Sequence, residues 1–162
     1  MKLTIARDTD DINSRFKVYD SKGAELCSIK GKDSASIKRL KAFDNTGACL
    51  FRISVTPEIG SRVGYNVVTK DYVFGITAKL KADTMCLRFH GIKLYFKGNI
   101  ITRDFEITDI SQKVLLHHKP EPGKNGCYSM NISDDSLADV MIAVAVCADM
   151  LSFADSAAAC RA

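Results

Sequence analysis

The chain has 162 residues, of which 46% are apolar and 26% charged, and its net charge is +4. This length and composition are those of one globular domain that buries a core without disulfide or metal staples, and they exclude disordered, collagen-like and coiled-coil proteins. We therefore expect a single domain over residues 1–162.

The N-terminal segment lacks the features of a secretory signal. No apolar segment or small-residue cleavage site follows Met1, and the acids Asp10 and Asp11 come soon after it. The six cysteines are dispersed along the chain, at Cys27, Cys49, Cys86, Cys127, Cys147 and Cys160. We expect reduced thiols in a cytoplasmic protein.

A hairpin pattern centred on an aspartate occurs three times. The copies are Phe16-x-Val18-Tyr19-Asp20-x-x-Gly23, Leu40-x-Ala42-Phe43-Asp44-x-x-Gly47 and Phe105-x-Ile107-Thr108-Asp109-x-x-Gln112. Alternating apolar residues predict a half-buried strand, the aspartate side chain caps the turn, and glycine supplies the positive φ before the return strand. Gln112 replaces the glycine in the third copy, which leaves the geometry of that turn open.

Further strands are indicated by short runs rich in β-branched and aromatic residues. These runs cover residues 65–68, 72–76, 85–89, 92–98 and 128–132. Counting both arms of each hairpin gives about ten or more strands, with turn signals at the spacing of a sandwich or a barrel.

The C-terminal segment predicts a helix over residues 135–153. Ser133, Asp134 and Ser136 offer capping oxygens at its start, and the run 140–148 is apolar on every face. Such a helix must lie inside protein or inside lipid. Nine apolar residues are far fewer than the roughly 20 that span a bilayer, and Asp139 and Asp149 flank them. We therefore expect the helix to be buried in a shell of strands.

Repeated hairpins followed by an apolar C-terminal helix make the chain resemble the LURP-one-related family, which shares its fold with Tubby and the phospholipid scramblases. The matching stretches are Phe16-Lys17-Val18-Tyr19-Asp20 with Gly23, Phe96-Lys97-Gly98-Asn99, Arg103-Asp104-Phe105-Glu106-Ile107, and Ile142-Ala143-Val144-Ala145-Val146-Cys147-Ala148-Asp149 after the strand at 128–132. The resemblance lies in pattern and order rather than in a diagnostic motif.

The resemblance implies a closed antiparallel barrel of about twelve strands around a central helix. It implies no enzyme activity. Tubby binds phosphoinositides through basic residues on its barrel and scramblases act at membranes, but no lipid-contact motif of Tubby matches this chain residue by residue.

Positive charge concentrates outside the C-terminal helix. Residues 134–162 carry five acids and one base, which leaves +8 on the rest of the chain. The segment 79–103 has six bases and one acid, and the candidate anion-binding residues in it are Lys79, Lys81, Arg88, Lys93, Tyr95, Lys97 and Arg103. Alternation along a strand would place Lys93, Tyr95 and Lys97 on one face, where they could bind phosphate groups. The alternative is a solvated face whose lysines discourage edge pairing.

A second basic cluster surrounds the serine-rich stretch at 34–36. It consists of Lys30, Lys32, Lys38, Arg39 and Lys41. It joins the first cluster only if the fold brings the two together.

Catalytic and metal-binding patterns are weak throughout. His117 and His118 are adjacent, so they point to opposite faces of a strand, and no C-x-x-C pair is present. The aspartates of the three hairpins are explained by their turns. Nucleotide, hydrolase and zinc-protease motifs are missing from the sequence. We expect no enzyme activity, no cofactor and no metal.

The leading interpretation is a non-enzymatic binding or scaffold domain, cytoplasmic or peripheral to a membrane. Its expected partner is an anionic phospholipid or an acidic protein, met through a basic barrel face, and not a nucleic acid. The alternative is a small-ligand carrier or an enzyme with a pocket at a barrel end, anchored by His117 or His118.

Overall fold

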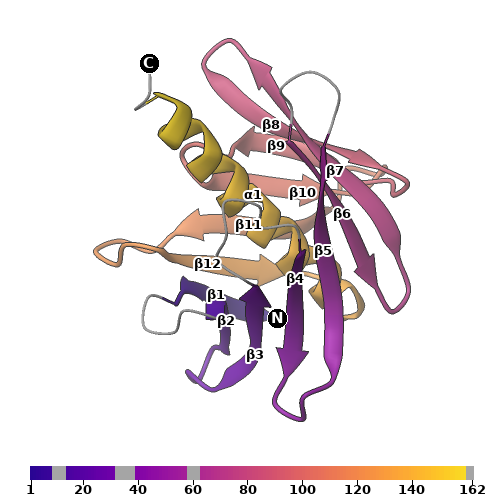
Figure 1. Cartoon of the computed structure of the whole chain (residues 1–162), viewed down its shortest axis with the longest axis vertical. Coiled ribbons are helices and arrows are strands. Elements are labelled where there is room, and N and C mark those ends of the chain that lie inside the picture. Colours follow the sequence, from indigo (N-terminus) through magenta and orange to yellow (C-terminus); the bar gives the residue numbers. More distant parts are fainter. Residues whose placement is uncertain (9–13, 32–38, 58–62, 160–162) are drawn as a thin grey trace.

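The fold was obtained as a computed structural model, which describes the backbone of residues 1–8, 14–31, 39–57 and 63–159 (Figure 1). Within these residues the chain forms twelve strands and a C-terminal helix. The strands are β1 (Lys2–Arg7), β2 (Ser14–Asp20), β3 (Glu25–Gly31), β4 (Arg39–Asp44), β5 (Cys49–Pro57), β6 (Val63–Thr69), β7 (Val73–Lys81), β8 (Thr84–His90), β9 (Tyr95–Asn99), β10 (Asp104–Thr108), β11 (Val114–Pro120) and β12 (Cys127–Ile132), and the 3₁₀ helix η1 (Asp135–Leu137) leads into α1 (Ala138–Ala159).

All ladders between neighbouring strands are antiparallel. The strand order runs from β8 back to β1, across to β12, and down to β9, so the ladder between β1 and β12 joins the two halves of the chain. The remaining gap lies between β8 and β9, where the Ile100 amide donates to the Met85 carbonyl at 3.0 Å and the Asn99 side chain accepts from the Met85 amide at 3.2 Å. The sheet is therefore a nearly closed barrel, and the predicted fold class is confirmed.

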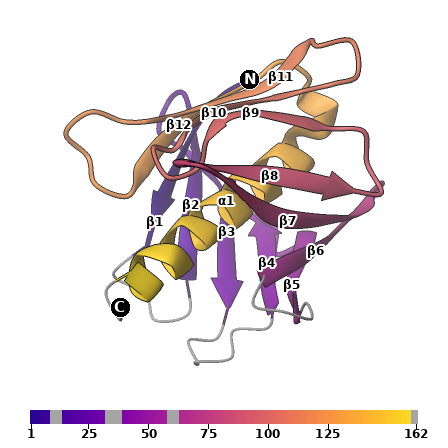
Figure 2. The same cartoon turned by 90° about the horizontal axis from the view of Figure 1, so that it is seen from above.

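Helix α1 lies against the inner faces of the strands (Figures 1 and 2). Its residues from Val140 to Asp149 are all buried, as the apolar run predicted. The helix continues to Ala159, six residues beyond the predicted end at Phe153, because the added residues are mostly alanines, which favour helix.

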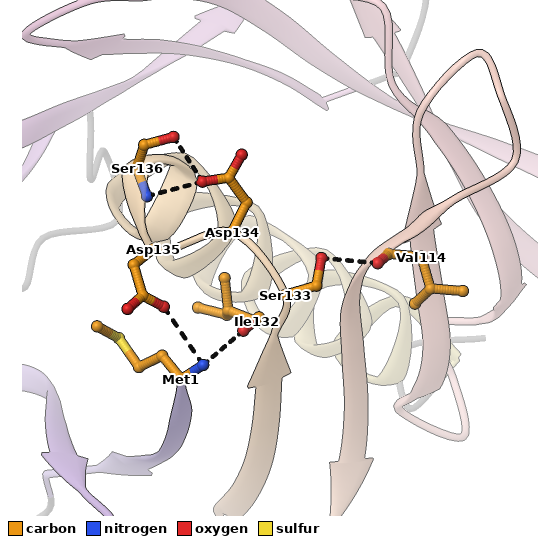
Figure 3. A network of polar contacts seen from close by, with 7 residues as sticks. All are labelled: Met1, Val114, Ile132, Ser133, Asp134, Asp135 and Ser136. Carbon is orange, nitrogen blue, oxygen red and sulfur yellow. Dashed lines mark hydrogen bonds and ion pairs between the residues drawn. The ribbon is translucent and has the colours of Figure 1, made fainter.

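The start of the helix is linked to Met1 and, through Met1, to the end of β12 by the polar network in Figure 3. Asp134 caps η1, since its Oδ1 accepts from the Ser136 amide at 3.0 Å and from the Ser136 hydroxyl at 2.6 Å. The Met1 ammonium group donates to the Ile132 carbonyl at 2.7 Å and lies 3.3 Å from the Asp135 carboxylate. These bonds set where the helix enters the barrel.

The three aspartate turns share one geometry. Asp44 Oδ1 accepts from the amides of Thr46 and Ala48, and Asp20 and Asp109 do the same two and four residues on. The fourth position has φ of +82° at Gly23, +84° at Gly47 and +64° at Gln112. Gln112 thus adopts the left-handed conformation without being glycine, and the third turn does not differ.

Alternating strand directions define two ends of the barrel. The entry end, where the helix begins, carries the turns at 21–24, 45–48, 70–72, 91–94 and 109–113. The exit end carries the turns at 82–83, 100–103 and 121–126 among the described residues.

Candidate functional site

Three cations form a row across the outside of the barrel. In the ladders, Lys30 of β3 pairs with Lys41 of β4, and Lys41 pairs with Arg52 of β5. All three side chains are exposed, while the residues on either side of Lys41 and Arg52 in the sequence point into the core. Neighbouring strands are about 5 Å apart, so the row is one of closely spaced positive charges. We call Lys30, Lys41 and Arg52 the basic row.

A hollow of about 200 Å³ lies beside the basic row on the outer wall of β5 to β8. A glycine opens the wall here: Gly75, which has no side chain, stands between Asn66 and His90 in the ladders. The hollow is lined by Thr56, Tyr65, Asn66, Gly75, Ile76, Thr77 and His90.

The polar groups of the hollow are hydrogen-bonding groups from four strands. The Thr77 hydroxyl lies 3.0 Å from His90 Nε2, which holds these two side chains together at one edge. Asn66 supplies an amide from the neighbouring strand, and Thr56 adds a second hydroxyl. Such groups can both donate to and accept from a bound polar molecule.

The wall around the hollow carries cations and no acid. Strands β5 to β8 contain no aspartate or glutamate. Arg88 stands opposite Thr77 in the ladder, and Lys79 and Lys81 follow along β7. Together with the basic row and Arg39, these exposed cations form a set that we call the basic face. Its members are Lys30, Arg39, Lys41, Arg52, Lys79, Lys81 and Arg88.

The strand order shows how the two predicted clusters lie relative to each other. The second cluster lies on β3 and β4 and the first begins on β7 and β8, with β5 and β6 between them, where Arg52 is the one cation. Lys32 and Lys38, which the second cluster also included, lie outside the described residues.

The predicted alternation of Lys93, Tyr95 and Lys97 is present, since all three are exposed while Leu94 is buried. Their surroundings differ from those of the basic face. Lys97 stands directly opposite Glu106 of β10, so this part of the wall has mixed charge.

Arg103 belongs to a different environment from the other candidate cations. Its Nε lies 3.2 Å from Oδ1 of Asp149, a helix residue that is only 3% exposed, and Arg7 Nε lies 2.7 Å from Oδ2 of the same carboxylate. The Arg103 guanidinium also lies 5.3 Å from the centre of the Tyr128 ring. The sequence placed Arg103 in the surface strip, but the β9–β10 turn directs it toward the helix.

The two adjacent histidines do occupy opposite sides of β11. His118 is buried and stacks between Phe105 and Tyr128, and its Nδ1 donates to the Arg103 carbonyl at 2.7 Å. Burial lowers the pKa of His118 to about 4. His117 is partly exposed, about 4 Å from two acids of β10. Neither histidine lines the hollow, so the anchors expected for a barrel-end pocket are not in this pocket.

Asn66 and Gly75 were not singled out from the sequence. A glycine inside a strand often marks a place where something approaches the backbone closely, and Gly75 interrupts the strand-like run at 72–76. That signal indicates one position only. The ladder between β6 and β7 is what places Asn66 beside it in one hollow.

The described cysteines are free thiols: Cys27, Cys49, Cys86, Cys127 and Cys147. Burial raises the pKa of the Cys27 thiol to about 12 and raises that of Cys147 as well, which suppresses their thiolate forms. Cys160 lies outside the described residues.

Two other kinds of feature do not occur in the described ranges. No group of three potential metal-ligating side chains occurs there. No helix in the described part of the chain combines the length and apolar character needed to cross a bilayer.

Comparison with known proteins supports the architecture. The family model described as LURP-one-related matches residues 1–149. The X-ray structure of the Arabidopsis thaliana protein AT5G01750 is similar in fold, with a TM-score of 0.61 and 15% sequence identity over 92% of this chain and 91% of that one. No curated protein matches the sequence.

Proposed function

The chain belongs to the LURP-one-related family, and from this premise we propose that it is a non-enzymatic binding domain that recognises anionic phospholipid headgroups through its basic face. The family and the fold do not themselves name a ligand. The proposal is supported by the exposed cations and the polar hollow on one wall of the barrel.

The observation that carries the proposal is the basic row beside the hollow. Lys30, Lys41 and Arg52 are neighbours in successive ladders, and no acid occurs in β5 to β8, the strands that begin at Arg52 and carry the hollow. A lysine or arginine close to an anionic membrane surface contributes about 1 kcal/mol to binding. Several such residues on one wall give a useful affinity only together.

The hollow supplies a position for a polar headgroup beside those charges. Asn66, Thr77 and His90 can hydrogen-bond to oxygen atoms, and Arg88 stands at the edge of the hollow. Charge-assisted hydrogen bonds from arginine to phosphate are among the stronger polar contacts. The combination suits an anionic phosphate ester better than an apolar ligand.

Vesicle co-sedimentation tests the proposal. The full chain should bind phosphatidylcholine vesicles that contain phosphatidylserine or a phosphoinositide, and binding to phosphatidylcholine alone should be negligible. Replacing two cations of the basic row (Lys41→Ala with Arg52→Ala) should weaken binding about thirtyfold, from about 1 kcal/mol for each lost charge.

The matched control removes the same charge from another wall. Lys97 and Lys119 are exposed on β9 and β11, and Lys97 already faces Glu106. The double variant Lys97→Ala with Lys119→Ala should retain most of the binding. Equal losses in the two double variants would show that net charge alone matters, and equal, negligible binding to both kinds of vesicle would exclude a lipid ligand.

A further inference from the structure

Exposed apolar side chains gather at the entry end of the barrel. Nine large apolar residues are exposed among those that the structure describes, and two of them, Leu80 and Ile101, lie at the exit end. The other seven lie at the entry end: Met1, Val68, Tyr72, Val73, Tyr95, Ile110 and Val114.

The β6–β7 turn carries the most compact of these groups. Val68 and Val73 face each other in the ladder and point outward, with Val73 70% exposed, and Tyr72 projects from the turn between them. The turn is ordered, because the Tyr72 amide donates to the Thr69 hydroxyl at 3.0 Å. Transfer of such exposed apolar side chains from water into an apolar environment lowers the free energy of the system.

Lysines stand beside the apolar residues on three successive turns. Lys70 occupies the β6–β7 turn, Lys93 the loop between β8 and β9, and Lys113 the β10–β11 turn that also carries Ile110. Two acids, Asp71 and Asp109, lie in these turns. The Asp109 carboxylate caps its own turn by accepting from the amides of Ser111 and Lys113.

One cation of the basic row stands beside the outermost valines. Arg52 pairs with Val68 in the β5–β6 ladder, and Val68 pairs with Val73, while Lys41 and Lys30 follow along the row toward the exit end of β4 and β3. Apolar turn tips with cations beside them are the arrangement of a surface that meets both the headgroups and the upper acyl region of a bilayer.

We propose that the domain docks on an anionic bilayer with the turns of β6–β7, β8–β9 and β10–β11 toward the lipid. In this orientation Tyr72, Val73 and Ile110 enter the interfacial region, and Lys70, Lys93 and Lys113 contact headgroups. This inference rests on the proposed lipid-binding function and adds to it the orientation and the residues that enter the membrane.

A bilayer is favoured over a folded protein partner because the apolar residues sit on separate projections. Val73 and Ile110 belong to strands β7 and β11 and their turns, with β8, β9 and β10 between them, and lysines stand among them. A fluid lipid surface accommodates isolated tips, whereas a stable protein interface usually needs one contiguous apolar core.

The rest of the entry end would keep the barrel tilted. Asp20, Asp44, Asp134 and Asp135 all lie there, on the β2–β5 side or at the start of the helix. Anionic headgroups repel these carboxylates, so the turns that carry them should stay off the surface. The barrel should rest on the β6–β11 part of the rim, with Arg52, which pairs with Val68, at the border of the contact.

Tryptophan fluorescence tests the orientation, because the chain contains no tryptophan. Val73→Trp places a reporter at the entry end of β7, and Leu80→Trp places one near the other end of the same strand, at 68% exposure against 70% for Val73. With anionic vesicles, Val73→Trp should shift its emission to shorter wavelength and be quenched by lipids brominated in the acyl chains. Leu80→Trp should show neither change.

Charge substitutions give a second, independent readout by co-sedimentation. Val73→Asp should weaken vesicle binding about tenfold through loss of apolar burial and added repulsion. Ile101→Asp, at an exposed site of the exit end and outside the basic face, should leave binding within about twofold. Both sites are exposed, so circular dichroism should show the fold retained in each.

The outcomes separate this inference from the function it rests on. If vesicles still bind and the Val73 reporter stays unquenched, the docking orientation is wrong while lipid binding stands. If the Leu80 reporter is quenched equally, the orientation is likewise wrong. If no vesicle is bound but polyglutamate is, the partner is an acidic protein, and both the lipid ligand and the docking mode are overturned.

Discussion

Asp149 of the central helix and Arg7 of the first strand are 142 positions apart in the chain and meet as an ion pair, with 2.7 Å between the carboxylate and Nε. Arg103, from the β9–β10 turn, lies 3.2 Å from the other carboxylate oxygen. One buried acid therefore joins the helix to two distant parts of the barrel wall.

Replacing this acid should destabilise the fold. Asp149→Ala leaves two partly buried guanidinium groups without their carboxylate, which should cost about 3 kcal/mol in the free energy of unfolding. Urea unfolding followed by circular dichroism measures the loss. Asp135→Ala removes an exposed carboxylate near Met1 and should cost far less. Equal losses would show that the Asp149 pair is not structurally important.

The helix interior should not tolerate a charge. Val144 is fully buried, so Val144→Asp places an unpaired carboxylate in the core and should abolish cooperative unfolding at room temperature. Val144→Ala, which leaves a small cavity, should fold with reduced stability. A Val144→Asp protein that still unfolds cooperatively near the wild-type midpoint would contradict the central position of the helix.

His118 should make the fold sensitive to mild acid. Burial holds its pKa at about 4 in the folded state, below the value of 6.5 expected when unfolded. The unfolded chain therefore binds a proton more readily, so the stability is fully present above about pH 6.5 and is lost as the pH falls from there toward 4. The loss is up to about 3 kcal/mol.

A variant comparison isolates this effect from the titration of carboxylates. His118→Phe keeps the stack between Phe105 and Tyr128 but has no group to protonate. The difference in unfolding free energy between pH 7 and pH 5 should be smaller in this variant than in the wild type. His117→Gln, at a partly exposed site, should retain the wild-type difference.

The third aspartate turn should improve with a glycine. Gln112 has a φ of +64°, a conformation that costs a non-glycine residue about 1 kcal/mol. Gln112→Gly should therefore raise the thermal midpoint by a few degrees. The reverse change at the equivalent position, Gly47→Gln, should lower it by a similar amount. A lower midpoint for Gln112→Gly would mean that the glutamine side chain contributes contacts of its own.

For the candidate site, the sequence predicted which side chains are exposed but not which groups they face. The two-residue period of a strand correctly placed Lys93, Tyr95 and Lys97 outward, and Lys79, Lys81 and Arg88 are exposed as expected. The period could not show that Lys97 faces Glu106, because that pairing depends on a ladder with another strand. It could not show that Arg103 turns toward Asp149 either.

What the sequence by itself determined was local or compositional. The aspartate turns follow from contacts within five residues, and burial of the helix follows from its apolar character on every face. Only the tertiary structure decided which surfaces exist, because strand register and the pairing of β1 with β12 join residues far apart in the chain. Those long-range pairings assemble the basic row, form the hollow around Gly75, and gather most of the exposed apolar side chains at one end.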